Sequence, residues 1–369
     1  MTRVLVVLGT RPEAVKLAPV IRALEAAPDF DPVVCLTGQH RQMLDQMLGF
    51  FGITAAHDLE VMTEGQTLTS LAAKVMERLP SVLEAVRPEW IVVQGDTTTA
   101  MTAALCGFYA GVKVAHVEAG LRTHDRFAPF PEEVNRKVIA AAADLHLAPT
   151  PAAEAALKAE GVPTAAIRRT GNTGIDSLLG AVEGVRATPP ASYPELDRKR
   201  LVLVTAHRRE SYDGGLAEIA GALCDLTAAF DDVAVVLPVH PNPKVRGPLE
   251  AALAGRERIH LTAPLDYPEF VSLLDRAALV LTDSGGVQEE AATLGKPMLV
   301  LRDVTERPEA LAAGARLTGA HRGAIVSAAS RLLGDADALA ALSRPTTVFG
   351  DGRAAERVVT ALAGFGAGG

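Results

Sequence analysis

Residues 277–290 read AALVLTDSGGVQEE, and this short stretch decides how the rest of the chain is interpreted. The apolar run 277–281 predicts a buried parallel strand, and the residues from Glu289 to Leu294 predict a helix that stops at Gly295. The Ser-Gly-Gly turn between them leaves backbone N–H groups with no side chain over them. Such a place favours phosphate, because the unpaired amides and the helix dipole both attract negative charge.

A carboxylate follows closely behind this turn. Glu290 lies in the first turns of the same helix, where a negative charge beside bound phosphate is unfavourable unless it serves another group. A ribose offers two hydroxyls to such a carboxylate, so the stretch is interpreted as half of a nucleotide site. The alternative is an ordinary strand-to-helix turn in which Ser284 caps the helix.

Length and composition narrow the class of protein. The chain has 369 residues, enough for two domains, and its 49% hydrophobic and 22% charged residues are typical of a soluble globular enzyme. No apolar run approaches the length of a membrane span and no secretory pattern opens the sequence, so we expect a cytoplasmic protein without a membrane partner. The formal net charge of −8 argues against nucleic acid as a partner.

The cysteines point to a reducing compartment. Cys35, Cys106 and Cys224 are far apart, odd in number and mostly in apolar company. They predict buried thiols rather than disulfides or a metal site, so no metal is expected.

Short apolar runs alternate with runs of helical length almost throughout the chain. The candidate strands are 4–8, 32–36, 90–93, 112–116 and 145–148, then 201–205, 233–238, 259–261, 279–282 and 298–301. This alternation predicts parallel sheets with right-handed crossovers, and strands that are apolar on both faces require helices on both sides. The sequence therefore predicts an α/β protein with two doubly wound, Rossmann-like domains facing a cleft.

The predicted domain break falls near residues 185 to 200, where 188–194 read TPPASYP. The first domain is expected at 1–185 and the second at 198–350. The closing segment 351–364 is helical and is a candidate to pack back across the cleft.

Ligands of parallel sheets lie outside the carboxyl ends of the strands, so we examine the polar residues that follow each predicted strand. After the first strand, Thr10 and Glu13 have the spacing of a capping box and are interpreted as structural. Arg11 and Lys16 place two cations near a helix start, which is unfavourable unless an anion binds there. No G-x-G-x-x-G follows any strand, so a tightly bound dinucleotide is not expected.

Three carboxylates follow strands or open a helix in the first domain. Asp96 stands at a strand end, where its alternative role is to cap the next helix, although one of 97–99 is expected to do that. Glu118 stands just past another strand, with Gly120 allowing close approach. Glu132 opens a helix, a position that the helix dipole alone also favours for an acid.

The second domain offers cationic and hydroxyl groups instead. His207 and His240 each follow a strand, without the spacing of metal ligands. Residues 305–307, Thr-Glu-Arg, follow the strand after the Ser-Gly-Gly turn and are expected to face the same phosphate. Acids in one domain and a phosphate–ribose site in the other suit a nucleotide-sugar, whose sugar faces groups that move protons.

The motifs named so far belong to a longer series that spans nearly the whole chain. In order they are Gly9–Glu13, Gly38–Arg41, Gly95–Thr98, Val117–Arg122, Pro131–Glu133, Gly171–Thr173, His207–Glu210, Asp283–Glu290 and Thr305–Glu309. Together and at this spacing they resemble the bacterial non-hydrolysing UDP-N-acetylglucosamine 2-epimerases.

The resemblance implies a glycosyltransferase-B-like fold and interconversion of UDP-N-acetylglucosamine with UDP-N-acetylmannosamine. In that family UDP is eliminated to leave bound 2-acetamidoglucal, and it is added back with the proton delivered to the other face of C2. No cofactor is implied. The resemblance also implies a homodimer and a role in making bacterial surface polysaccharide precursors.

Matched motif by motif, the resemblance also implies site residues. The acid/base group is Asp96, Glu118 and Glu132, with His207 near the diphosphate and also required. The implied UDP contacts are Arg11, Lys16, His207, Phe270 on the uracil side, Ser284, Gly285, Gly286, Glu290 on the ribose, and Arg307.

Some members bind a second UDP-N-acetylglucosamine as an allosteric activator. The residues that match this pocket are Gln39, Gln42, Glu132, Arg208 and His240. Three positions depart from the pattern. Gly65 stands where members with an activator carry an arginine, Gln94 replaces a histidine usual before Gly95, and Ser211 replaces an asparagine usual after Glu210.

Three other functions remain open at this stage. A transferase of the same architecture would pass the sugar to an acceptor, a binding protein would hold it without turnover, and a hydrolysing relative would release N-acetylmannosamine and UDP. Three acids beside the sugar favour elimination and re-addition over transfer, which needs one general base.

Overall fold

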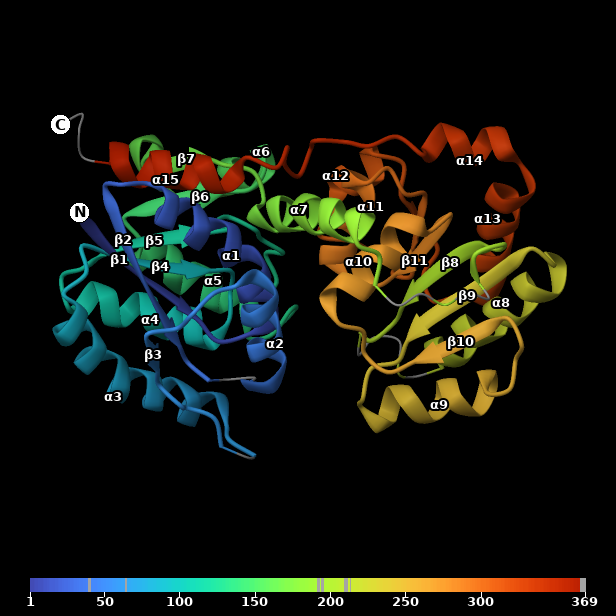
Figure 1. Cartoon of the computed structure of the whole chain (residues 1–369), viewed down its shortest axis with the longest axis horizontal. Helices are drawn as coiled ribbons and strands as arrows, with labels where there is room; N and C mark the ends of the chain where they lie inside the picture. Colours follow the sequence, from blue (N-terminus) through green and yellow to red (C-terminus); the bar gives the residue numbers. More distant parts are fainter. Residues whose placement is uncertain are drawn as a thin grey trace. The chain divides into compact units, whose positions relative to one another are not determined.

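The computed structural model describes residues 1–38, 41–63, 65–190, 193, 196–208, 212 and 214–365, and for 41–43 it describes the backbone alone. The chain forms two compact units, one from Met1–Ser177 with Phe349–Gly369 and the other from Leu178–Val348. It passes from the first unit to the second inside α7 (Thr173–Ala187) and returns after Val348 (Figure 1).

Among the described residues, the first unit is built on a seven-stranded sheet in the order β3-β2-β1-β4-β5-β6-β7. The strands are β1 (Thr2–Leu8), β2 (Phe30–Leu36), β3 (His57–Asp58), β4 (Trp90–Gln94), β5 (Lys113–Val117), β6 (Leu145–Ala148) and β7 (Ile167–Arg169). The helices are α1 (Arg11–Ala26), α2 (Arg41–Phe51), α3 (Leu68–Val86), α4 (Thr98–Tyr109), α5 (Glu132–Ala142), α6 (Pro151–Ala159) and α15 (Ala354–Gly364), with the short 3₁₀ turn η1 (Thr164–Ala166).

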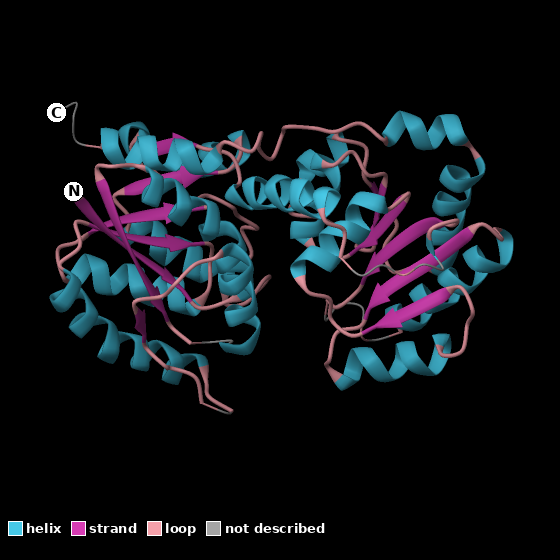
Figure 2. Ribbon diagram, viewed as in Figure 1, coloured by secondary structure: helices cyan, strands magenta, loops and turns pink. Residues whose placement is uncertain are grey.

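Every neighbouring pair in this sheet is parallel, and helices lie on both sides of it (Figure 2). On one side α1 packs against α2 and α15, and on the other α3 packs against α4 and α4 against α5. The strands are therefore buried on both faces, which explains their continuous apolar runs. The strand order reverses between β1 and β4, and the carboxyl ends of these two strands border the crevice where such folds bind ligands.

The second unit repeats this plan with a six-stranded parallel sheet, in the order β10-β9-β8-β11-β12-β13 within the described chain. The strands are β8 (Arg200–Thr205), β9 (Val233–Pro238), β10 (Ile259–Thr262), β11 (Leu279–Thr282), β12 (Met298–Val300) and β13 (Arg316–Leu317). The helices are α8 (Gly215–Ala229), α9 (Pro243–Leu253), α10 (Tyr267–Arg276), α11 (Gly285–Thr293), α12 (Pro308–Ala312), α13 (Arg322–Gly334) and α14 (Ala336–Leu342). Here the order reverses between β8 and β11.

The predicted α/β class and the two doubly wound, Rossmann-like domains are confirmed, and every predicted strand is present. One helix boundary was wrong. The structure begins α11 at Gly285, directly after Ser284, and not at Glu289. Within the described part of the chain, no helix has both the length and the hydropathy needed to cross a membrane.

Candidate active site

Glu13 ties together two loops at the switch point of the first sheet. Its Oε2 accepts the backbone N–H of Gly9 at 2.8 Å and of Thr10 at 2.7 Å, and Oε1 accepts the hydroxyl of Thr97 at 2.7 Å. Burial raises the pKa of this carboxyl, and the hydrogen bonds from Thr97, Gly9 and Thr10 offset part of that effect. The capping box predicted from Thr10 and Glu13 is confirmed, and Glu13 also reaches the loop after β4.

Replacing Glu13 with alanine is expected to lower the free energy of unfolding by about 3 kcal/mol, because buried N–H and hydroxyl donors would lose their acceptor. Glu13→Gln keeps one carbonyl acceptor at the same place and should cost less. Urea unfolding of the full chain measures both variants. Equal stability of the alanine variant and the unmodified protein would contradict this role.

Asp96 follows β4, and its carboxylate is held by a cation from α5. Arg136 donates to Oδ2 of Asp96 from Nε at 2.9 Å, and its Nη2 lies 2.6 Å from the same oxygen. The side chain of Asn135 donates to the backbone carbonyl of Asp96 at 2.8 Å. Thr97 caps α4 by accepting the N–H of Ala100, so the alternative of Asp96 as the cap is wrong.

A buried histidine shapes the turn that leads to this carboxylate. His116 Nε2 lies 2.7 Å from the carbonyl oxygen of Gly95, whose φ of +72° suits glycine. Burial lowers the pKa of His116 to about 3, so the ring is neutral at physiological pH. A neutral ring that faces a carbonyl carries its proton on Nε2 and donates it there.

Glu118 follows β5 with a positive φ of 65°. Its Oε2 accepts hydrogen bonds from the ammonium of Lys16, on α1, and from the side-chain amide of Gln94, at the end of β4. The sequence predicted a phosphate as the partner of Lys16, and in this structure Lys16 pairs with Glu118. Arg11, the other predicted phosphate ligand of this loop, is the first residue of α1 and is half-buried.

Adjacent glutamates at the start of α5 have different surroundings. Glu133 is fully buried and accepts the N–H of Thr123 at 3.0 Å and of His124 at 3.1 Å. The Oε2 of Glu132 is also buried, but it has no hydrogen-bond partner among the described residues. A buried carboxylate oxygen without a protein donor is suited to a ligand proton or hydroxyl.

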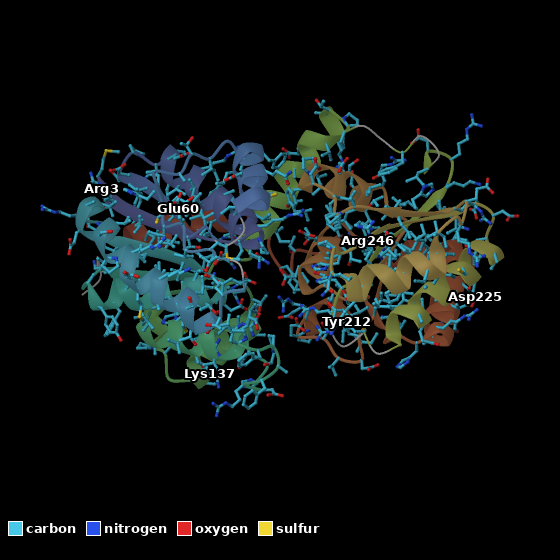
Figure 3. All side chains as sticks on the ribbon, turned by 90° about the horizontal axis from the view of Figure 1, so that it is seen from below. Arg3, Glu60, Lys137, Tyr212, Asp225 and Arg246 are labelled. Atoms are coloured by element: carbon cyan, nitrogen blue, oxygen red, sulfur yellow. The ribbon has the colours of Figure 1, made fainter. Side chains whose placement is uncertain are left out.

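His207 follows β8 in the second unit and is paired with the buried carboxylate of Asp283, which follows β11. Asp283 Oδ2 accepts the backbone N–H of His207 at 2.6 Å and of Arg208 at 2.7 Å, and Oδ1 lies 3.1 Å from His207 Nδ1. Burial opposes ionisation of Asp283, but the contacts with His207 and both N–H groups leave its pKa below the usual range. Tyr212, labelled in Figure 3, donates to the backbone carbonyl of His207 at 3.3 Å.

The predicted Ser-Gly-Gly turn opens α11 directly. Ser284 occupies the cap position, but its side chain makes no capping hydrogen bond. A side chain added at Gly286 would meet nothing within 4 Å, whereas at Gly285 it would lie 3.3 Å from Glu306 Oε1. The N–H groups at the start of an α-helix have no partner inside the helix. This turn therefore has the open approach that a phosphate requires.

A network of charges lies beside this turn. Arg307 is buried and pairs with Glu289 of α11, and its Nη1 lies 3.8 Å from Glu306 Oε1. Arg302 donates to Glu306 Oε2 at 2.5 Å. Burial alone would raise the pKa of Glu306, but the charges of Arg307 and Arg302 outweigh it and leave the pKa below its usual value. The hydroxyl of Thr305 donates to Gln288 at 2.7 Å. The predicted phosphate ligands of 305–307 thus have protein partners in this structure.

The remaining predicted ligands are spread over the second unit. Phe270 is half-buried in the first turn of α10, and Glu290 is half-buried in α11. The ring of His240 lies 6.1 Å from that of His207, nearly parallel to it, and burial and the His207 charge both lower the pKa of His240. Arg208 Nη2 lies 3.8 Å from Glu306 Oε1.

Part of the predicted activator pocket cannot be placed. Gln39 and the side chain of Gln42 lie outside the described residues. Gly65 is exposed, with a φ of +70°.

Sequence reasoning did not assign a role to Arg136, Asn135 or Asp283. Asp283 had a usable signal, since it is an acid directly after a buried strand, as Glu118 is and Asp96 nearly is. The sequence offered no comparable signal for Arg136 and Asn135, apart from their place one turn into α5. Among the described residues, no group of three or more His, Cys, Asp or Glu side chains is arranged to hold a metal.

Comparison with known proteins supports one family. Residues 22–363 match the family model for UDP-N-acetylglucosamine 2-epimerase. The chain is 45% identical to the UDP-N-acetylglucosamine 2-epimerase of Escherichia coli K12 and 47% identical to a probable one of Ralstonia nicotianae, over 98% and 99% of this chain and 98% and 100% of theirs.

Among solved structures, the UDP-GlcNAc 2-epimerase of Neisseria meningitidis bound to UDP-GlcNAc superposes with a TM-score of 0.91. It is 38% identical, and the match covers 98% of this chain and 100% of that one. The match runs through both units. The chain belongs to the UDP-N-acetylglucosamine 2-epimerase family.

Proposed function

We propose that the protein reversibly converts UDP-N-acetylglucosamine to UDP-N-acetylmannosamine at C2, without net hydrolysis. The observation that carries the proposal is the way two strand-end carboxylates are held. Arg136 donates to one oxygen of Asp96, Oδ2. Lys16 and Gln94 donate to one oxygen of Glu118, Oε2. Each carboxylate is thereby fixed in place with its second oxygen pointed elsewhere, as a group that exchanges a proton with a substrate requires. The relative bound to UDP-GlcNAc supports the choice of substrate.

The reaction balances without an oxidant or a reductant. One carboxylate takes the proton from C2 while the bond from C1 to the diphosphate oxygen breaks and its electron pair leaves with UDP. C1 and C2 are then doubly bonded, as in 2-acetamidoglucal. In the return step a diphosphate oxygen attacks C1, and a second carboxyl delivers a proton to the opposite face of C2. Asp96, Glu118 and Glu132 are the proposed proton carriers.

We assign most of the contacts with UDP to the second unit. The turn of Ser284, Gly285 and Gly286 offers backbone N–H groups to a phosphate, and Glu290 is proposed to bind the ribose hydroxyls. His207, oriented by Asp283, is proposed to face the diphosphate and stabilise charge on the leaving oxygen. The other proposed contacts are Arg11 and Lys16 with the diphosphate, Phe270 on the uracil side, and Arg307.

Gly286→Val tests the phosphate turn. The new side chain has open space, so the fold should be unaffected, but it would cover the N–H groups of α11. The Kd for UDP is expected to rise about 10- to 100-fold, because each hydrogen bond to a charged group contributes about 1.5–3 kcal/mol. Gly247→Val is the matched control, since Gly247 lies in the exposed part of α9 with equal space around it. Isothermal titration with UDP should leave the control unchanged, and equal Kd values for both variants would remove the turn from the site.

Incubation with UDP-N-acetylglucosamine alone in deuterated water tests the reaction. We expect deuterium at C2 in both UDP-sugars, read by NMR and mass spectrometry. Free N-acetylmannosamine with UDP would indicate a hydrolysing enzyme instead. Turnover that needs an added acceptor would indicate a transferase, and binding without any exchange would indicate a binding protein.

Three finer assignments rest on the family resemblance alone. We propose that Arg208 and His240, with Gln39 and Gln42, bind a second UDP-N-acetylglucosamine as activator, that the protein is a homodimer, and that its product feeds surface polysaccharide synthesis. A sigmoidal dependence of rate on substrate tests the first, and light scattering tests the second. A hyperbolic dependence would contradict an activator.

A further inference from the structure

The first turns of α5 contribute one residue to the proposed site directly, and they also hold another site residue in place. Glu132 is one of the proposed proton carriers, and Asn135 and Arg136 both hold Asp96, another of them. Glu133 lies between them in sequence and binds Arg136. A single helix therefore carries one acid and supports a second.

The contacts of Arg136 are asymmetric. Its Nε and Nη2 both reach Oδ2 of Asp96, at 2.9 and 2.6 Å, and neither reaches Oδ1. A hydrogen bond from Nε and a close charge contact from Nη2 on the same oxygen restrict rotation of the carboxylate about its last bond. The third nitrogen, Nη1, donates to Glu133 Oε2 at 3.2 Å.

Glu133 fixes the guanidinium in its turn. Its side chain is 1% exposed, and it accepts backbone N–H groups from Thr123 and His124 in the loop that follows Glu118. These hydrogen bonds fix the carboxylate of Glu133 to the backbone of that loop, and the same carboxylate binds Arg136. The chain of contacts thus runs from that loop, through Glu133 and Arg136, to Asp96.

We propose that Arg136 is a positioning residue for Asp96, with Glu133 as its anchor, so that Oδ1 of Asp96 is presented for proton exchange. This inference rests on the proposed function, in which Asp96 exchanges a proton at C2. Arg136 itself touches no reacting atom. Its removal should therefore slow the chemical step and leave binding of UDP intact.

The first experiment compares Arg136→Lys and Arg136→Met with Arg3→Lys. Arg3, labelled in Figure 3, binds Asp31 from the opposite, amino-terminal end of the same sheet, so it is a matched control. Both Arg136 variants should lower kcat, the methionine variant by about 100-fold, because small misplacement of a reacting group has effects of this size. The KM and the Kd for UDP should change little, the lysine variant should keep part of the rate, and Arg3→Lys should behave as the unmodified protein. Unchanged kcat in Arg136→Met would overturn the inference.

The second experiment separates positioning from general stability. Arg136→Met is combined with Asp96→Asn, and deuterium exchange at C2 is followed for long enough to detect residual rates. If Arg136 acts through Asp96, the methionine change should have an effect close to onefold in the Asp96→Asn background. The same loss in both backgrounds would show that Arg136 acts elsewhere and would overturn the inference, while the proposed function would stand.

Two further readouts keep the test decisive. Glu133→Gln retains the shape of the side chain but weakens its contact with Arg136, so it should lower kcat less than Arg136→Met does. It provides a test even if Arg136→Met does not fold. A full rate in Glu133→Gln and Arg136→Lys together would overturn the inference. A full rate in Asp96→Asn alone would overturn the proposed function, and the role of Arg136 with it.

Discussion

Asp96→Asn is expected to lower the rate of epimerisation by about 10³-fold and to leave the Kd for UDP nearly unchanged, because an asparagine at this place cannot take or give the proton. The substitution is almost isosteric, and the backbone contact of Asp96 with Asn135 does not involve the side chain that changes. The phosphate turn, the ribose contact and His207, which are proposed to bind UDP, lie in the other unit. The loss should therefore appear in kcat, and deuterium exchange at C2 should fall by the same factor.

The control for this variant is Asp144→Asn. Asp144 is exposed and accepts the N–H of Val114 at 2.8 Å at the amino-terminal end of the sheet, away from the strand ends that carry the site. The same chemical change there should leave kcat within about twofold of the unmodified protein, as expected for a substitution at the surface away from the proposed site. A normal rate in Asp96→Asn would exclude Asp96 from proton transfer. A matching loss in Asp144→Asn would indicate a general effect of removing a charge from this unit.

Asp283→Ala is expected to destabilise the protein by about 3 kcal/mol, because it leaves two buried N–H groups without an acceptor and removes the partner of an imidazole. Activity should fall by at least about 10²-fold, since His207 would lose the group that fixes its ring and its tautomer. Urea unfolding and the rate of epimerisation measure the two effects. Asp231→Asn, at a fully exposed carboxylate in the same unit, is the control and should change neither.

The stability contributed by Asp283 should also depend on pH. Its pKa in the folded protein lies below its ordinary value, so the stabilisation is fully present above that ordinary value, near 3.8, and is lost as the pH falls through the lower, folded value. Asp283→Asn should therefore lose less stability than the unmodified protein over that acid range. Parallel profiles of unfolding free energy against pH for the two proteins would contradict this assignment.

The sequence predicted the long strands well because a strand covered by helices on both faces must be apolar along its length. It missed β3, β7 and β13, which are two or three residues long and carry His57, Asp58 or arginines in place of an apolar run. Such edge strands form because a neighbouring strand offers its unpaired backbone groups. That offer is a property of the folded sheet and leaves no pattern in the strand itself.

The site shows the same division. Strand-end reasoning selected Asp96, Glu118, His207 and the Ser284 turn as candidates, because chain direction alone brings the ends of parallel strands to one edge of each sheet. It did not separate Glu132 from Glu133. The rotation of α5 buries Glu133 on three donors and leaves an oxygen of Glu132 without one among the described residues, and that rotation depends on how the helix packs.

The first unit is built from two separate stretches of chain, and this affects how it is made on the ribosome. The carboxylate of Asp176 accepts the N–H groups of Ala354 and Ala355, and the ring of Phe365 lies 5.1 Å from that of Trp90. The ribosome has to synthesise the whole second unit before the residues that contact Asp176 and Trp90 are made. Until α15 is synthesised, the face of α1 that α15 covers is exposed, and we expect chaperones to bind a growing polypeptide in this state.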